Sequence, residues 1–236
     1  MRDCRAFRIE LNGVNLSAAV HLPLDVPAPV IICSHGLLSS KDSSKYLAIG
    51  EHMSNLGFCV LRFDFSGCGQ SAARRETLVG ARMRDLNAVL TFARTQPWSD
   101  GHIGLLGSSL GGFLSLLAAN ENPDIVNATV SWVAPFDISH LDPAGSGMDE
   151  LKRLIPGGFE LGEPRDLGDL RNVRNALLIH GREDEVVPWT HSIEIYKRIG
   201  DPKDLILMRD ADHQLTDESW RAVAIRATLD WFARFF

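Results

Sequence analysis

The stretch "GLLGSSLGG" at residues 104–112 places two serines among glycines, directly after a short apolar run. Residues 107–111 fit the pattern G-x-S-x-G with Ser109 at its centre. In this pattern the serine occupies a sharp strand-to-helix turn, and the flanking glycines avoid collisions with the neighbouring strand and helix. Apolar residues precede the turn, and "LGGFLSLLAAN" after it has a helical pattern that ends before Pro123. The stretch therefore predicts a strand, a turn that exposes Ser109 as a candidate nucleophile, and a helix, with Ser108 as the neighbour of the nucleophile.

Further short apolar runs on both sides of this stretch predict a parallel sheet. Strands that helices cover on both faces are apolar nearly throughout, and alternation with helical patterns is typical of a doubly wound α/β fold. One predicted helix carries an apolar stripe from Val79 to Ala93, and the last has its stripe at Trp220, Val223, Ala224, Ala227, Trp231 and Phe235. The predicted strands lie at 29–36, 58–64, 102–108, 128–135, 175–181 and 204–210.

Two segments depart from this alternation. The first 22 residues alternate apolar and polar residues around Asn12-Gly13, which predicts an antiparallel hairpin at a sheet edge. Residues 137 to about 172 are rich in glycine, proline and charge, and we expect them to form a short lid over the carboxyl ends of the strands. We expect residues 1–236 to form a single domain of this mostly parallel α/β type.

Composition excludes several classes of protein. The formal charge is −6 without a basic cluster, which argues against a nucleic-acid or anionic-membrane partner. No apolar stretch is long enough for a membrane span, and the start resembles no signal peptide, so we expect a cytoplasmic protein. The four cysteines form no CxxC pair, and the sequence offers no metal-ligand cluster. The oligomeric state is left open.

A serine nucleophile needs a base and an acid that orients the base. On this architecture they follow the serine in the order acid, then histidine, on loops after strands. We predict that His213 is the base, because it follows "LILMRDAD" and precedes the final helix, whereas His140 opens the lid, His180 lies within a strand and His191 begins a helix. We predict that Asp184 in "HGREDEVVP" is the acid, with Glu183 and Glu185 as alternatives. Asp210 and Asp212 are too close to His213 in sequence.

The negative charge on a tetrahedral intermediate needs two backbone N–H donors. We predict the N–H groups of Leu110, after the nucleophile, and of Leu37, in the loop "CSHGLL". Gly36 lets that loop turn, and we expect His35 to support it, although His35 is also a competing candidate base. Gly107 and Gly111 support the turn at Ser109.

The chain resembles the α/β-hydrolase superfamily over nearly its whole length. It is most similar to small lidded serine esterases, such as cinnamoyl and feruloyl esterases, and to the sequence class labelled serine aminopeptidase-like. The dienelactone hydrolases are similar in size, but their nucleophile is typically a cysteine where this chain has Ser109. The shared marks are "SHG" (34–36), "DFSGCGQS" (64–71), "GSSLGG" (107–112), "HGREDEVVP" (180–188) and "DADH" (210–213).

Two other classes fit the sequence less well. Residues 67–72 match G-x-G-x-x-G/A, which could indicate a dinucleotide-binding oxidoreductase. Another strand–helix unit precedes this match, however, and the acidic residue at the right distance, Asp85, lies in a helical pattern. A non-catalytic binding protein that kept the fold would not need the serine, histidine and acid together.

The sequence therefore predicts a serine hydrolase that cleaves a carboxylic ester of an apolar or aromatic acyl group, with water as second substrate and no metal or cofactor. A thioester, amide or peptide substrate is the alternative on the same three residues. An aminopeptidase would need an acidic anchor, for which Asp142, Asp149 and Glu150 are available. The candidate substrate-binding residues are Leu38, Phe136, Met148 and Trp189, and Leu37, Leu151, Ile155 and Phe159 are further apolar residues near the predicted site.

Overall fold

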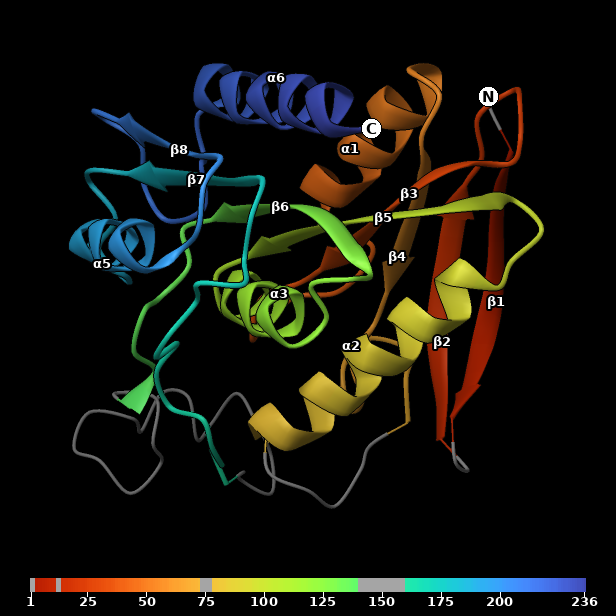
Figure 1. Ribbon diagram of the computed structural model, residues 1–236, viewed down its shortest axis with the longest axis horizontal. Coiled ribbons are helices and arrows are strands. Elements are labelled where there is room, and N and C mark those ends of the chain that lie inside the picture. Colours follow the sequence, from red (N-terminus) through yellow and green to blue (C-terminus); the bar gives the residue numbers. More distant parts are fainter. Residues whose placement is uncertain (1–2, 12–13, 73–77, 140–159) are drawn as a thin grey trace.

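The apolar runs form one eight-stranded sheet in the computed structural model, which describes residues 3–11, 14–72, 78–139 and 160–236 (Figure 1). The strands are β1 (Cys4–Leu11), β2 (Val14–His21), β3 (Ala28–Ser34), β4 (Cys59–Phe63), β5 (Ser99–Ser108), β6 (Val126–Trp132), β7 (Ala176–Gly181) and β8 (Lys203–Met208). The described helices are α1 (Ser44–Asn55), α2 (Leu78–Arg94), α3 (Leu110–Glu121), α5 (Thr190–Arg198) and α6 (Glu218–Phe235).

The strand order is β1-β2-β4-β3-β5-β6-β7-β8. The strands from β4 to β8 pair in parallel, whereas β1 and β2 form an antiparallel hairpin that joins the sheet through β4. The predicted mostly parallel α/β fold with an N-terminal antiparallel hairpin at the sheet edge is confirmed. Because the parallel strands run the same way, their carboxyl ends meet at one edge of the sheet.

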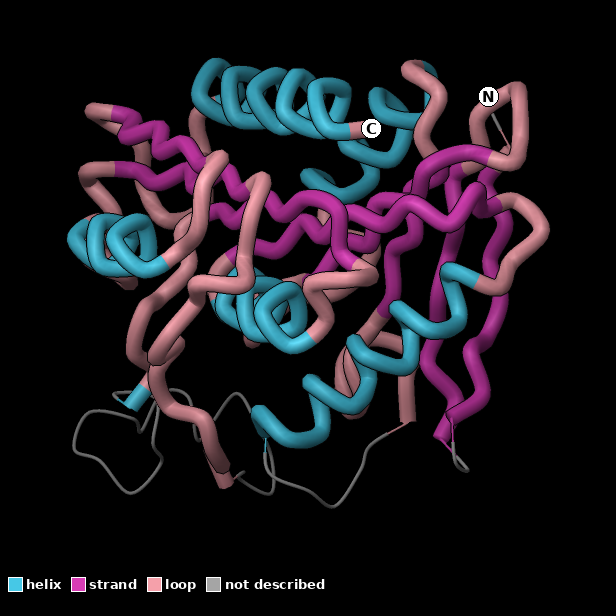
Figure 2. Tube along the Cα trace, in the orientation of Figure 1, coloured by secondary structure: helices cyan, strands magenta, loops and turns pink. Residues whose placement is uncertain are grey.

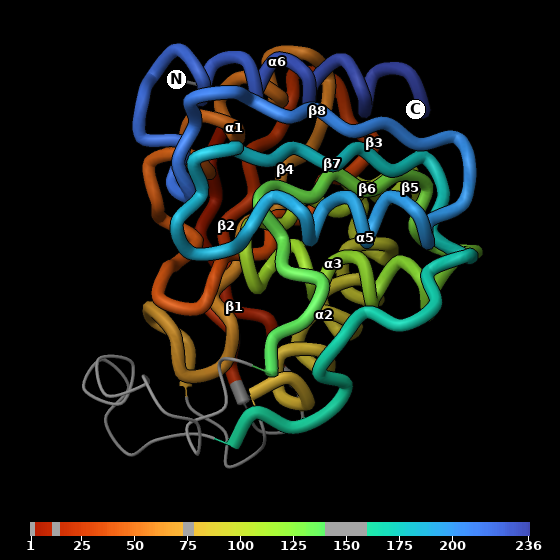
Figure 3. The backbone as a smooth tube through the Cα atoms, turned by 90° about the vertical axis from the view of Figure 1, so that its left-hand side faces the viewer, coloured from red at the N-terminus to blue at the C-terminus, as the bar shows by residue number. Residues whose placement is uncertain are grey.

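Helices cover both faces of the sheet and create two cores (Figures 1 and 2). Helices α1 and α6 lie on one face, where they enclose Ile31, Leu106 and Leu177. Helices α2, α3 and α5 lie on the other face, where Ile32 and Leu105 are buried. The view along the sheet separates the two helical layers (Figure 3). Neighbouring residues of one strand point to opposite cores, which explains why these strands are apolar nearly throughout.

The buried stripe of α6 differs from the predicted one. Val223 is 46% exposed and Trp220 is only partly buried, whereas Ile225, Leu229 and Phe232 face the sheet together with Ala224 and Trp231. Successive residues point about 100° apart around a helix axis, so a predicted stripe that is displaced by one residue faces partly toward solvent. The helix begins at Glu218, where the Asp217 carboxylate caps it by accepting the Ser219 N–H at 2.7 Å.

Most of the expected lid lies outside the described residues. On either side of the gap, Asp137 and Asp166 form an antiparallel bridge, and Leu161, Leu167 and Leu170 are buried against the body of the protein. The lid function of residues 137–172 therefore stays a prediction. No helix in the described ranges is long and apolar enough to cross a membrane.

Candidate active site

Ser109 lies in a strained turn between β5 and α3. Its backbone has φ 56° and ψ −126°, which a residue with a side chain rarely adopts. The Ser109 N–H donates to the Trp132 carbonyl of β6 at 2.9 Å, and the Ser109 carbonyl accepts N–H groups from the first turn of α3. The turn is held in place on both sides, which compensates for a backbone strain of about 1–3 kcal/mol.

The two glycines around Ser109 are required by close backbone contacts. A Cβ atom at Gly107 would lie 2.2 Å from the Gly111 carbonyl oxygen. One at Gly111 would lie 2.0 Å from the Ser34 carbonyl oxygen at the end of β3. Both obstacles are backbone atoms, which cannot rotate away as a side chain can.

His213 and Asp184 meet Ser109 at the carboxyl edge of the sheet. His213 Nε2 is 3.1 Å from Ser109 Oγ, and His213 Nδ1 is 2.7 Å from Asp184 Oδ2. Both the His213 and Asp184 side chains are buried. A proton on Nδ1 faces the carboxylate, so Nε2 is left free to accept the Ser109 hydroxyl proton. Glu183 and Glu185 are exposed, and of the three candidate acids Asp184 is the one beside His213.

Close packing of two strand-end loops brings Asp184 to His213. A Cβ atom at Gly181 would lie 2.1 Å from the Ala211 carbonyl oxygen, so the loop after β7 needs glycine there to approach the loop after β8. The Glu183 N–H then donates to the same Ala211 carbonyl at 3.1 Å. Residues 29 positions apart therefore form a buried pair.

Asp184 also contacts a second imidazole, which the sequence analysis placed only inside a strand. His180 Nε2 lies 3.1 Å from Asp184 Oδ2 and 2.9 Å from the Val187 carbonyl oxygen, so this nitrogen faces two acceptors and carries the proton. The other carboxylate oxygen accepts the N–H groups of Val186 and Val187 at 2.9 and 2.7 Å. Burial alone would raise the pKa of Asp184, but the hydrogen bonds from the two imidazoles and from Val187 hold it far below its usual value.

The proposed N–H donors lie on either side of Ser109. Leu110 is the first residue of α3 and directly follows Ser109. The loop after β3, which carries Leu37, also lies close to the nucleophile, as a Cβ atom at Gly36 would be 3.9 Å from Ser109 Oγ. Neither the Leu37 nor the Leu110 N–H hydrogen bonds to any other residue that the structure describes. Their role as donors to an oxygen atom bound next to Ser109 stays a prediction.

His35 holds the loop that carries Leu37. Its Nδ1 donates to the Gly36 carbonyl at 2.7 Å, and its Nε2 accepts the Phe65 N–H at 3.1 Å. Together the two bonds require the neutral ring with the proton on Nδ1. Burial, followed by the positive charge of Arg82, lowers the pKa of His35 to about 4, so the ring is neutral at physiological pH. These contacts are consistent with the expected role of His35 in loop support, and it is His213 that contacts Ser109 Oγ.

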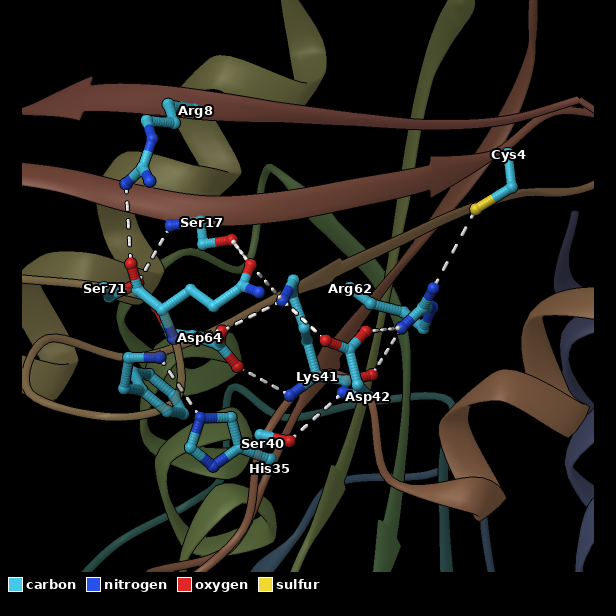
Figure 4. Close-up of polar contacts among 12 residues, drawn as sticks. Cys4, Arg8, Ser17, His35, Ser40, Lys41, Asp42, Arg62, Asp64 and Ser71 are labelled. Atoms are coloured by element: carbon cyan, nitrogen blue, oxygen red, sulfur yellow. Dashed lines mark hydrogen bonds and ion pairs between the residues drawn. The ribbon is translucent and has the colours of Figure 1, made fainter.

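A buried charged cluster ties the same loop to β4 (Figure 4). Asp64 is fully buried, and its carboxylate accepts the Lys41 N–H at 2.7 Å, the Lys41 ammonium at 3.1 Å and the Gln70 N–H at 3.0 Å. Arg62 donates to the Lys41 carbonyl at 2.5 Å and to the Asp42 carboxylate at 3.0 Å. The sequence signal for this cluster was the presence of Arg62 and Asp64 in the otherwise apolar run at residues 58–64.

Lys45 is a further charged group near the site that the sequence analysis missed. Its ammonium donates to the Ser108 hydroxyl at 2.7 Å. Ser108 thus has a hydrogen-bond partner of its own and does not contact His213 in the way that Ser109 does. Burial, with a smaller contribution from Arg221, lowers the pKa of Lys45 to about 8.

The predicted substrate-binding residues have different surroundings. Leu38 is 57% exposed and follows the Leu37 loop directly, so it is free to contact a ligand. The Phe136 ring lies 4.4 Å from the Arg198 guanidinium, and the Trp189 ring lies 5.1 Å from that of Arg182. Nothing among the described contacts joins these two rings to Ser109, and their role stays a prediction. Met148 lies outside the described residues, as do Leu151, Ile155, Phe159, His140, Asp142, Asp149 and Glu150.

Comparison with known proteins relates this geometry to one family. Residues 29–150 match the family model described as alpha/beta hydrolase fold. Among curated proteins, the mitochondrial palmitoyl-protein thioesterase ABHD10 of Mus musculus is 30% identical over 233 residues, which cover 89% of this chain and 77% of that protein. The Homo sapiens protein of the same name is 27% identical over 234 residues, with coverage of 89% and 74%.

Solved structures agree with this result. The structure of alpha/beta hydrolase domain-containing protein 10 from mouse has a TM-score of 0.79 at 24% identity and covers 98% of this chain and 100% of its own. Est1E from Butyrivibrio proteoclasticus with bound ferulic acid has a TM-score of 0.77 at 21% identity and covers 98% and 99%. At these identities the structural likeness establishes the shared fold.

Proposed function

Since the chain belongs to the α/β hydrolase fold family, we propose that it is a serine hydrolase that cleaves a carboxylic ester through an acyl-enzyme intermediate. The observation that carries this proposal is the hydrogen-bonded series from Ser109 through His213 to Asp184, with distances of 3.1 and 2.7 Å. A nucleophile, a base within hydrogen-bond reach and an acid that orients the base are the minimum that this chemistry requires.

In the proposed first step, Ser109 Oγ forms a bond to the acyl carbon while His213 Nε2 takes the hydroxyl proton. The carbonyl oxygen becomes negatively charged and accepts the N–H groups of Leu37 and Leu110. The tetrahedral intermediate then collapses, the bond to the leaving alcohol breaks, and Nε2 returns its proton to that alcohol. Asp184 stays ionised throughout and stabilises the imidazolium that forms on His213.

In the second step, water takes the place of the alcohol. His213 Nε2 accepts a proton from the water as its oxygen attacks the acyl carbon, and the same N–H donors stabilise the second oxyanion. The proton then goes to Ser109 Oγ, which leaves as the free hydroxyl, and the carboxylic acid product departs. Loss of one such N–H donor typically slows a reaction of this type by about 10²–10³.

An apolar or aromatic acyl group fits the exposed Leu38 beside the Leu37 loop. A thioester is the second candidate substrate, because the curated relatives with 27–30% identity are named as palmitoyl-protein thioesterases. The same residues serve both bonds, since a thiolate leaves more easily than an alkoxide and needs less help from His213. The cytoplasmic location expected from the sequence stays a prediction, because those relatives are named as mitochondrial.

The first test is covalent labelling with a fluorophosphonate probe, which reacts with an activated serine. We expect wild-type protein and Ser108→Ala to be labelled, Ser109→Ala to remain unlabelled, and peptide mapping to place the label on Ser109. The Ser108 variant is the matched control, because it removes the neighbouring hydroxyl alone. Absence of labelling in folded wild-type protein would refute the proposed function.

A second assay separates the two candidate substrates. Rates with p-nitrophenyl butyrate and with the corresponding butyryl thioester are compared in the wild type and in Ser109→Ala. Hydrolysis of the oxygen ester at the higher kcat/KM supports the esterase proposal. A kcat/KM for the thioester that is higher by about tenfold or more, after correction for its intrinsic reactivity, supports a thioesterase instead.

A further inference from the structure

Arg82 is a buried cation without an acidic partner in direct contact. It lies on α2 and is 3% exposed, and no carboxylate among the described residues forms an ion pair with it. Its Nε and Nη1 atoms are buried and make no hydrogen bond. Burial of a charge is costly and lowers the pKa of Arg82, although the negative charge of Asp85, which is not in direct contact, opposes this effect. A buried cation with N–H groups that lack acceptors calls for a functional explanation.

The one bonded nitrogen of Arg82 points at the loop beside the nucleophile. Nη2 donates to the Leu37 carbonyl at 3.2 Å and contacts the Cys68 sulfur at 3.2 Å. The guanidinium also lies 5.1 Å from the Phe65 ring, whose face partly offsets the missing counter-ion. The His35 ring packs edge-on against the same Phe65 at 5.0 Å. Arg82, Phe65 and His35 therefore surround the segment that carries the Leu37 N–H.

The two peptide groups that flank Leu37 are each held by a different side chain. His35 Nδ1–H binds the Gly36 carbonyl at 2.7 Å, which fixes the peptide plane that contains the Leu37 N–H. Arg82 binds the Leu37 carbonyl, which fixes the next peptide plane. With both planes fixed, rotation about the φ and ψ bonds of Leu37 is restricted, and its N–H keeps one direction.

The charge of Arg82 also acts on His35. The bond from the Phe65 N–H exists only when His35 is neutral, because a protonated Nε2 could not accept it, whereas Nδ1–H can donate to the Gly36 carbonyl in either state. After burial, Arg82 contributes most to the low pKa of His35, with Lys45 in the same direction, while the hydrogen bond to Gly36 and the charge of Asp64 oppose it. A positive charge at Arg82 therefore favours the ring state that holds the loop.

From these contacts we propose that Arg82 is a positioning residue of the oxyanion site around the Leu37 N–H, because it fixes the Leu37 carbonyl and favours the neutral His35 ring. The free Nε and Nη1 atoms are inaccessible to solvent, so the charge acts through the loop and through space. This inference rests on the proposed function.

The test uses Arg82→Met, which removes the charge and keeps much of the apolar volume, and Arg82→Lys, which keeps the charge. For Arg82→Met we expect kcat for p-nitrophenyl butyrate to fall by about 10- to 100-fold, with KM nearly unchanged. This decrease in rate is no larger than the one caused by removal of an N–H donor that contacts the oxyanion directly. The inhibition constant of a trifluoromethyl ketone, whose adduct with Ser109 carries an oxyanion, should rise by a similar factor. Arg82→Lys should recover part of both losses.

A stability measurement separates this role from a structural one. Replacing an unpaired buried charge by an apolar side chain should leave the urea midpoint unchanged or raise it. Val89→Ala on the same helix is the matched control, because Val89 is buried in the core under α2. This variant protein should be less stable than wild type but keep the wild-type kcat. An Arg82→Met protein that is slower but at least as stable as wild type supports the proposal.

Three results would overturn it. The first is a kcat of Arg82→Met within about twofold of wild type. The second is a rise in KM with kcat unchanged, which would assign Arg82 to substrate binding. The third is an unchanged inhibition constant of the trifluoromethyl ketone. If Arg82→Met does not fold, kcat, KM and the inhibition constant are measured on Arg82→Lys instead. An NMR titration of Arg82→Lys is then added, in which the proposal requires the pKa of His35 to stay low. A wild type that reacts with the fluorophosphonate at Ser109 while the Arg82 variants keep full activity would overturn this inference alone.

Discussion

Replacing Asp184 by asparagine tests the arrangement of the site at a single atom. One carboxylate oxygen of Asp184 accepts the N–H groups of Val186 and Val187, and the other faces His213 at 2.7 Å and His180 at 3.1 Å. An asparagine at this position keeps its carbonyl toward the two backbone donors, because an amide NH₂ there would meet two N–H groups. Its NH₂ group must then face both imidazoles.

This orientation changes the tautomer of His213. Nδ1 must accept a hydrogen bond from the new NH₂ group, so the ring proton moves to Nε2, which can then no longer accept the Ser109 proton. The loss of imidazolium stabilisation adds to this effect. We expect kcat/KM to fall by about 10⁴, which corresponds to roughly 5 kcal/mol of transition-state stabilisation. The fold should be retained, because the backbone N–H groups of the loop keep their acceptor.

The assay is hydrolysis of p-nitrophenyl butyrate alongside the rate of fluorophosphonate labelling, with urea unfolding as the check on folding. Glu183→Gln and Glu185→Gln are matched controls, because both carboxylates are exposed in the same loop, and each should react at the wild-type rate. A folded Asp184→Asn protein within about tenfold of wild type would refute the tautomer argument. The role of acid would then pass to whichever glutamate variant is slow.

Three other substitutions probe the structure around the site. Lys41→Met breaks a buried ion pair with the fully buried Asp64 and should lower the free energy of unfolding by about 3–5 kcal/mol in urea titrations. A decrease below about 1 kcal/mol would mean that the ion pair does not support the loop. Gly111→Ala places a Cβ atom 2.0 Å from a backbone oxygen, so Tm should fall by an amount that corresponds to about 1–3 kcal/mol or more, and an unchanged Tm would contradict the packing. The folded chain binds the Lys45 proton more weakly than the unfolded chain, because its pKa is lowered from 10.5 to about 8, chiefly by burial and also by Arg221. Wild-type stability should therefore rise as pH increases from about 8 to 10.5, and Lys45→Met should be more stable than wild type at pH 7 but lose that advantage by pH 10.5. Equal urea midpoints at pH 7 would disprove this linkage.

Much of the fold follows from local sequence patterns. The central parallel strands are short apolar runs because they are buried on both faces, whereas β8 at the edge of the sheet is only partly buried. The hairpin shows alternation because it lies at the other edge of the sheet. Strand order does not follow from such patterns, since β4 lies between β2 and β3 through contacts between distant segments. Helix α1 was expected only as part of a strand–helix unit before residues 67–72, without bounds, although Tyr46, Ile49 and Met53 are buried at helical spacing.

The site shows the same division. The chain order of serine, acid and histidine at strand ends predicted that Ser109, Asp184 and His213 would meet, and the structure places them within hydrogen-bond distance. The contacts of His180 and Arg82 could not be predicted in this way. Each depends on the direction of a side chain within a buried element, which is decided by packing against a neighbouring segment rather than by local pattern.

The long separation in sequence between the parts of the site has a consequence for how activity develops during folding. Ser109 and His213 are 104 positions apart, and His213, the proposed base, follows the edge strand β8. A folding intermediate with the sheet complete only as far as β6 would contain the nucleophile and its strained turn but neither acid nor base. Recovery of hydrolysis during refolding should therefore follow the last strand pairing, that of β7 with β8, and lag behind the burial of the central strands.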